Sequence, residues 1–190
     1  MERQELVRRL LGVATDLFIN DKDPFSVYCL ASTAGEHAAE LARQTSGETF
    51  NDQILKTFPE KSIRYIRQLR NRDWNAIKHA RHLDGSLRLP EKELADFSDI
   101  ANDHMLFIVW YDYASARLPL PIAVQVFQVW YFEMYPEAQE PEVDKTEIFG
   151  SLSALSRSGC KEKLRKKIIK YSTDETLLAH DKTDQRPLVL

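Results

Sequence analysis

The residues best suited to chemistry lie in one run, from Arg70 to His82. Each residue of an α-helix turns about 100°, so a helix through this run places its polar side chains in one sector about 80° wide: Arg72, Asn75, His79 and His82. A guanidinium stays charged and can bind a phosphate through two hydrogen bonds, and an imidazole can exchange a proton near neutral pH. The spacing therefore favours chemistry on a phosphodiester.

Arg72 and His79 are the candidate catalytic pair. His79 would act as general base or acid towards the 2′-hydroxyl of RNA, and Arg72 would stabilise the developing charge. Asn75, Lys78 and His82 are candidate binding residues beside them, with Glu36 from the preceding long helix. The sequence thus offers a metal-independent site for RNA.

Two other interpretations of these residues stay open. In the favoured one, Arg72, Asn75 and His79 form a structural hydrogen-bond network with Glu36 or His37. In the other, His79 and His82 bind a metal ion from one helix, as Glu-x-x-His pairs do in helical bundles. Its remaining ligands would come from Glu36, His37, Asp103 and His104. No metal site is predicted.

The charge is unevenly distributed along the chain. The total of 26 basic and 29 acidic residues gives a net charge of −3. Residues 56–92, the first basic zone, hold ten basic and four acidic residues, and residues 151–190, the second basic zone, hold nine and five. A polyanion such as RNA is a possible partner for such zones.

Length and composition limit the remaining classes. A chain of 190 residues with 43% hydrophobic residues and 6 glycines is suited to one globular domain. The glycines are scattered, so no phosphate loop and no cofactor are predicted. Two distant cysteines and an N-terminus unlike a signal peptide indicate the cytoplasm, and no apolar stretch is long enough for a membrane span.

Apolar residues at helical spacing predict the elements. The predicted helices are, in order, 6–17, 24 to about 45, a short one at 51–57, a long one from 59 to about 83, 91–117, 122–135 and a basic one at 161–170.

The fold prediction is all-α, an up-and-down-like helical bundle of about five helices with a basic C-terminal extension. The bundle domain covers residues 1–136, a polar linker 137–159, and the short basic helix with a tail 160–190. Small residues on helix 24–45 and a dense aromatic cluster at 107–135 predict faces for a protein partner or a homodimer.

The chain resembles an uncharacterised all-helical family of bacterial proteins over about residues 11–136. That family carries an Asn-aromatic-aromatic-Lys-His-Ala signature, matched by Asn75, Lys78, His79 and Ala80. The run 11–43 and the closing segment 127–136, with Trp130-Tyr131-Phe132 before a proline, are similar to the beginning and end of the family. The resemblance implies an all-helical fold, and it does not indicate any particular activity.

More remotely, the layout resembles the HEPN superfamily of nucleic-acid-associated helical domains. Its motif, an Arg with a polar residue after it and then a His, is matched by Arg72, Asp73 and His79. The resemblance implies a metal-independent ribonuclease site composed across a dimer.

Two functions therefore remain open, and with them whether the chain is an enzyme. One is a helical interaction protein that binds a protein partner or itself through its aromatic and small-residue helix faces. The other is a HEPN-like ribonuclease or RNA-binding protein that uses Arg72 and His79.

Overall fold

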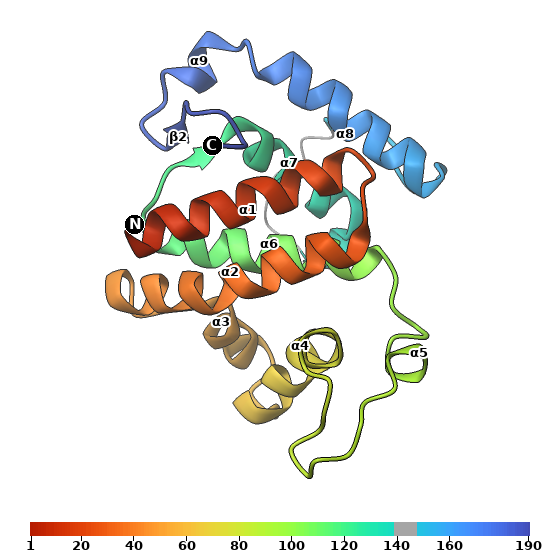
Figure 1. Cartoon of the computed structure of the whole chain (residues 1–190). Helices are drawn as coiled ribbons and strands as arrows, with labels where there is room; N and C mark the ends of the chain where they lie inside the picture. Colours follow the sequence, from red (N-terminus) through yellow and green to blue (C-terminus); the bar gives the residue numbers. More distant parts are fainter. Residues whose placement is uncertain (139–147) are drawn as a thin grey trace.

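Five helices bring their apolar faces together in one core (Figure 1). The structure, a computed structural model, describes residues 1–138 and 148–190. Helices α1 (Arg3–Ile19), α2 (Pro24–Thr45) and α6 (Ile100–Ser115) pack side by side, and α7 (Ile122–Met134) and α8 (Arg157–Tyr171) pack against them. The two fully buried indoles keep their hydrogen bonds, because Trp110 donates to the Thr15 hydroxyl at 2.9 Å and Trp130 to the Cys160 carbonyl at 3.2 Å.

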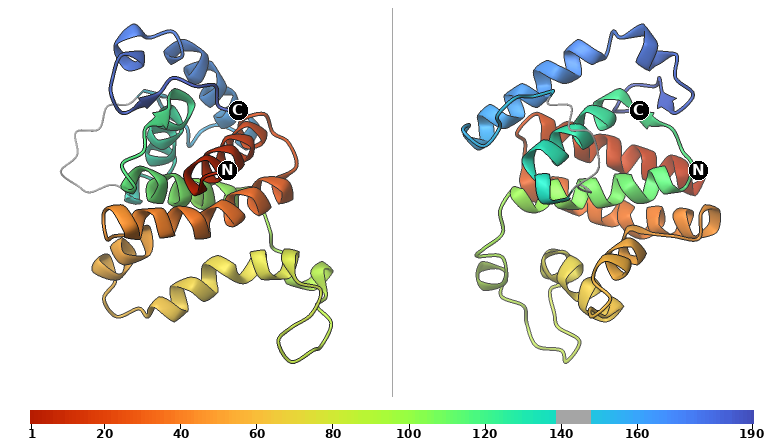
Figure 2. Two further views of the ribbon diagram at one scale, coloured as in Figure 1. Left: turned by 60° about the vertical axis from the view of Figure 1, so that its left-hand side comes forward. Right: turned by 180° about the vertical axis from the view of Figure 1, so that it is seen from behind.

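Helices α3 (Phe50–Thr57), α4 (Ile63–Lys78) and the short α5 (Pro90–Glu93) form a second layer on the other side of α2 (Figures 1 and 2). Their starts are set by local side-chain caps. Thr49 and Asp52 form a capping box at α3, and the Ser62 hydroxyl accepts from the Tyr65 backbone N–H at α4. This layer adds no side chain to the buried apolar cluster of the core.

The C-terminal residues are fixed on α1 by a buried arginine. The Arg8 side chain is fully buried and donates to the Asp184 carboxylate at 2.8 Å and to the carbonyls of Leu188 and Pro187 at 2.7 and 2.8 Å. Gly12 permits this approach, because a Cβ there would lie 2.0 Å from the Leu188 carbonyl oxygen. The tail also adds β2 (Thr183–Asp184) in parallel to β1 (Leu120–Pro121), after the short α9 (Glu175–Leu178).

Helix α8 is fixed on the core by paired charges. Lys161 is 2% exposed and contacts Asp99 at 2.7 Å and Asp21 at 3.2 Å. Arg157 contacts Asp99 at 2.8 Å and Asp103 at 2.5 Å. Burial opposes the ionisation of Asp99, but hydrogen bonds from Lys161 and Arg157 hold its pKa below the ordinary value. The basic residues of α8 that face the core therefore act within the fold.

The structure confirms the all-α prediction and corrects its details. The described residues form nine α-helices, a 3₁₀ turn at Pro136–Ala138 and the two short strands, rather than about five helices. Helices α2 and α7 begin at the predicted residues, whereas the helix predicted at 91–117 is split into α5 and α6.

The prediction that the long helix runs to about residue 83 is wrong. Helix α4 ends at Lys78, and His79 has an extended backbone. Beyond it, Arg81 pairs with Leu87 in an antiparallel bridge, and the turn between them uses Gly85 with φ of +85°. The Asp84 carboxylate accepts from the Ser86 backbone N–H at 2.9 Å, which fixes this turn. The calculated polar sector therefore does not include His79 and His82.

The faces predicted for a partner are also occupied within the chain. The small-residue face of α2 (Ala31, Ala34, Ala38 and Ala42) is buried, as are Trp110, Phe127 and Trp130 of the aromatic cluster. Tyr111, Phe132 and Tyr135 of the same cluster are only half-buried, and a homodimer or a protein partner remains a prediction.

The structure describes only part of the predicted polar linker, because residues 139–147 lie outside the described residues. Among the described helices, none is long and apolar enough to cross a membrane.

Candidate anion-binding pocket

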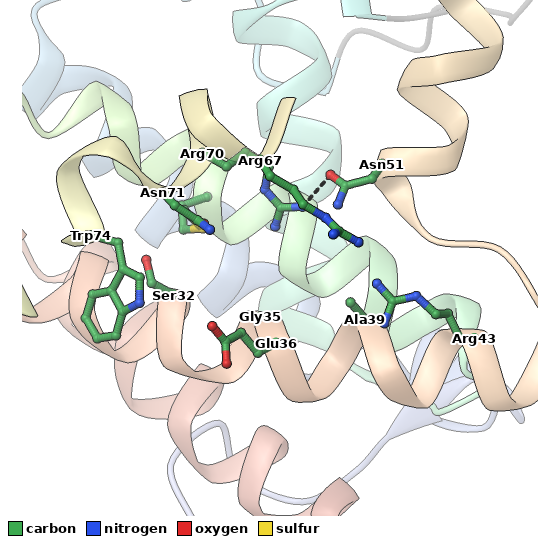
Figure 3. A pocket seen from close by; sticks show the side chains of 11 residues that line it. Ser32, Gly35, Glu36, Ala39, Arg43, Asn51, Arg67, Arg70, Asn71 and Trp74 are labelled. Atoms are coloured by element: carbon green, nitrogen blue, oxygen red, sulfur yellow. Dashed lines mark hydrogen bonds between the residues drawn. The ribbon is translucent and has the colours of Figure 1, made fainter. Parts of the chain in front are cut away.

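A pocket of about 280 Å³ lies where the second layer meets α2 (Figure 3). Helix α2 supplies its floor, α4 faces it, and single residues come from α3 and α6. Its lining contains three arginines, Arg43, Arg67 and Arg70, and one acidic residue, Glu36. The remaining residues are Ser32, Gly35, Ala39, Asn51, Asn71, Trp74 and Met105.

Arg70 is the innermost of the three arginines. Its guanidinium donates to the Asn51 side-chain oxygen at 2.6 Å, and its backbone carbonyl accepts from the Tyr28 hydroxyl at 3.1 Å. Burial lowers the pKa of Arg70, and the nearby carboxylate of Asp112 opposes that effect. Among the described residues its side chain forms no ion pair, so this half-buried cation has only a neutral hydrogen-bond partner.

Asp112 lies behind Arg70 and is itself poorly compensated. Burial raises its pKa to about 6, against the hydrogen bond from the Phe50 backbone N–H and the attraction of Arg70. Its Oδ1 accepts that bond at 2.6 Å, whereas its Oδ2 is buried without a partner in the described structure. Asp112 therefore attracts Arg70 from nearby, but no ion pair joins the two side chains in the described structure.

The other two arginines lie at the rim. Arg67 forms no ion pair with the described residues, and Arg43 contacts Glu40 at 3.1 Å in an exposed pair. Figure 3 shows the guanidinium groups of Arg67 and Arg70 beside Asn51, with Arg43 facing them from α2. Three like charges around one opening repel one another, so a bound anion would relieve this repulsion.

Ser32 adds a free hydroxyl at the opposite end of the pocket. The residue is 8% exposed, and its Oγ has no partner in the described structure. In Figure 3 this oxygen is directed towards Asn71 and Trp74. A serine in a helix usually donates to the carbonyl four residues earlier or to water, so the Ser32 hydroxyl is a buried polar group that lacks its usual partner here.

The glycine on the pocket floor allows α2 to lie close to its neighbours. A Cβ at Gly35 would lie 3.1 Å from a methyl group of Val109 on α6 and 3.9 Å from the Arg70 guanidinium. The absence of a side chain therefore matters most for the close packing of α2 against α6, since the distance to Arg70 is an ordinary contact.

The two predicted catalytic residues lie outside this pocket. The exposed side chain of Arg72 contacts its own neighbour, Asp73, at 2.7 Å. His79 is exposed just beyond the end of α4. The structure therefore places Arg72 on the helix and His79 after it, and neither lines the pocket.

The predicted binding residues are divided between several places. Glu36 lines the pocket. Lys78 lies over the Trp74 ring, 5.4 Å from its centroid, and His82 contacts Glu93 at 3.4 Å in the segment after α4. Asn75 is half-buried on α4 and is not among the lining residues.

The predicted metal alternative finds no ligand set. No group of three His, Cys, Asp or Glu side chains within residues 1–138 and 148–190 can hold a metal ion. His104 instead contacts the Tyr131 hydroxyl at 2.9 Å through Nδ1, and burial lowers its pKa.

Sequence reasoning missed most of the pocket. Arg67, Asn71 and Trp74 recur at helical spacing on α4, as do Ser32, Glu36, Ala39 and Arg43 on α2. Each pattern marks one face, but an arginine face on a helix is usually solvated, and neither pattern says that the two faces meet. Asn51 comes from a third helix and carries no signal of its own.

Comparisons of the chain with protein families, curated proteins and solved structures found no match. The two resemblances described above therefore remain predictions.

Proposed function

We propose that this chain binds a small phosphate-bearing ligand in the pocket between α2 and α4. The observation that carries the proposal is the half-buried cation Arg70, which has no ion pair in the described structure and opens onto a pocket with two further guanidinium groups. A charge that is partly removed from water is costly unless a partner compensates it. A phosphate can accept two hydrogen bonds from each of several guanidinium groups, which matches this donor set.

The size of the pocket favours a small ligand. Its volume of about 280 Å³ lies near the lower end of the range for small-molecule sites. Neutral donors surround the arginines, since Asn71 and Trp74 carry side-chain N–H groups and Ser32 a hydroxyl. The lining therefore suits an anion that is rich in oxygen acceptors.

Calorimetry with inorganic phosphate and pyrophosphate tests the proposal. Arg67→Ala should weaken pyrophosphate binding about 10-fold, because one charge-assisted contact is lost. Arg64→Ala is the matched control, because Arg64 is an exposed arginine on the same helix outside the pocket. Added salt should weaken binding to the native protein. Equal affinity of the two variants, or no binding of either anion at millimolar concentration, would contradict the proposal.

The ribonuclease hypothesis is a separate proposal with its own test. It is supported by the exposure of both Arg72 and His79, which leaves them accessible to a polymer. RNA cleavage is measured in the presence of a chelator for the native protein, Arg72→Ala and His79→Ala. Activity that both variants lose supports a site on this surface. Its absence from the native protein, or equal activity in all three, overturns the hypothesis.

A further inference from the structure

One carboxylate in the pocket has no partner within the described structure. Glu36 is exposed at the pocket that the three arginines also line, and it forms no ion pair or hydrogen bond with a described residue. Arg43, the nearest arginine along α2, contacts Glu40 instead. A simple anion such as inorganic phosphate would be repelled by this carboxylate, so Glu36 is unexplained if the ligand is only an anion.

The spacing of residues on α2 separates the pocket into two ends. Ser32, Glu36 and Arg43 lie at positions i, i+4 and i+11 on one face. At a rise of 1.5 Å per residue, Glu36 lies about 6 Å along the helix axis from Ser32 and about 10 Å from Arg43. Figure 3 shows the Glu36 carboxylate between the arginines and Ser32. Ala39 between Glu36 and Arg43 is small and leaves space above this stretch of the helix.

A ligand that suits both ends carries an anionic group and hydrogen-bond donors a few ångströms away. An ammonium donor is less suitable than a hydroxyl, because the three guanidinium groups and one carboxylate give the lining a net positive charge. Neutral hydroxyl groups can donate to a carboxylate without this repulsion and can accept from Ser32 and Asn71.

We propose that the ligand is a polyol phosphate, such as a sugar phosphate. This inference rests on the proposed function and specifies its ligand class. The phosphate binds Arg43, Arg67 and Arg70, and the hydroxyl groups donate to Glu36. The half-buried indole of Trp74, at the end of the pocket with Ser32, packs against the carbon–hydrogen face of the polyol.

The experiment compares phosphate monoesters that differ in their hydroxyl groups. Affinities are measured by calorimetry for inorganic phosphate, glycerol 3-phosphate, ribose 5-phosphate and glucose 6-phosphate, with glucose as the uncharged control. At least one sugar phosphate should bind about 10-fold more tightly than inorganic phosphate, because a hydrogen bond to a charged group adds to the phosphate contacts.

The Glu36→Gln variant gives effects of opposite sign. It should weaken binding of the best sugar phosphate about 5-fold to 10-fold, because a charged acceptor is lost. It should strengthen binding of inorganic phosphate about 2-fold to 5-fold, because a negative charge leaves the pocket. Glu91→Gln, which changes an exposed residue of α5 outside the pocket, should leave both affinities unchanged.

Two other results overturn the inference and differ from each other. If Glu36→Gln strengthens binding of every phosphate compound, or if no sugar phosphate binds more tightly than inorganic phosphate, the pocket is an anion site without polyol recognition. The proposed function survives that result. If none of the phosphate compounds binds, the proposed function fails and the inference fails with it.

Discussion

The two basic zones of the chain have similar compositions and opposite surroundings. In the second zone, Arg157 and Lys161 contact Asp99 at 2.8 and 2.7 Å and lie against the core. In the first zone, Arg67 forms no ion pair with the described residues, and Arg70 has only a neutral partner, Asn51. Positive charge in α8 thus fastens one element to another, whereas positive charge in α4 faces a pocket.

The difference shows that a cation drawn into the fold can be paired with carboxylates of the chain or left without one. Lys161 is 2% exposed and has two carboxylate contacts, so its charge is compensated within the chain. Arg70 is half-buried, and although the Asp112 carboxylate lies near it, no carboxylate of the described residues contacts its guanidinium. The absence of a contacting carboxylate, rather than the number of arginines, identifies the site.

The largest expected effect is the loss of the clamp on the C-terminal residues. Arg8→Met should lower the free energy of unfolding by about 3–5 kcal/mol, because it leaves the carbonyls of Pro187 and Leu188 without this donor and the buried Asp184 with Arg186 alone. Urea unfolding measures the change. Arg9→Met is the control, since its exposed pair with Glu5 is worth at most about 0.5 kcal/mol. Similar losses in both variants would show that the clamp does not stabilise the fold.

The next effect tests the paired cation of α8. Lys161→Met should lower the free energy of unfolding by about 2–3 kcal/mol. This loss is smaller than the loss expected when a buried charge keeps no partner, because Asp99 keeps Arg157 and Asp21 is partly exposed. Lys166→Met removes an exposed lysine of the same helix that pairs only with Glu162 and should change stability by less than about 0.5 kcal/mol. Thermal unfolding of both variants distinguishes the two roles. Equal stability of the two variants would contradict the comparison of the two zones.

The third effect concerns pH. The folded pKa of Asp112, about 6, lies above its ordinary value of 3.8, so the folded state holds this proton more tightly. The stability from this group is full below pH 4 and is lost as the pH rises through 6. The stability of Asp112→Asn relative to the native protein should therefore rise by about 3 kcal/mol from pH 4 to pH 8.

Urea unfolding at a series of pH values measures this difference. Asp181→Asn, which changes an exposed side chain, serves as the reference for a substitution without burial. A difference between Asp112→Asn and the native protein that stays constant from pH 4 to pH 8 would show that Asp112 ionises normally in the fold.

The smallest expected effect on stability belongs to the pocket. Arg67→Ala should change the free energy of unfolding by less than about 0.5 kcal/mol, because its exposed side chain has no partner to lose. It should nevertheless weaken binding of pyrophosphate, as described above. A loss of stability as large as that of Lys161→Met would mean that Arg67 is structural and that the two regions do not differ.

The helices of the core could be predicted because local signals agree there. Asp23 before Pro24 marks the start of α2, and apolar spacing marks α1 and α7. The end of α4 was missed because Ile77 and Ala80 continue its apolar pattern. The signal that corrects it is the pair Asp84-Gly85, which favours a hairpin turn.

The site could be predicted only in part. The sequence marks Glu36 as a candidate binding residue, whereas nothing in it distinguishes Arg67 and Arg70 from the arginines of a solvated helix face. Their role depends on Asn51, 19 residues before Arg70, and on the packing of α4 against both α2 and α3. Such contacts between separate helices have no periodic signature in one sequence.

Gly35 gives the pocket a simple route to new ligand preferences. Because a Cβ here would lie 3.1 Å from a methyl group of Val109 and 3.9 Å from the Arg70 guanidinium, a substitution would fill part of the pocket floor and press on α6 without removing a charged group. Ligand size could then diverge among variants of this chain independently of charge, through changes at a single position.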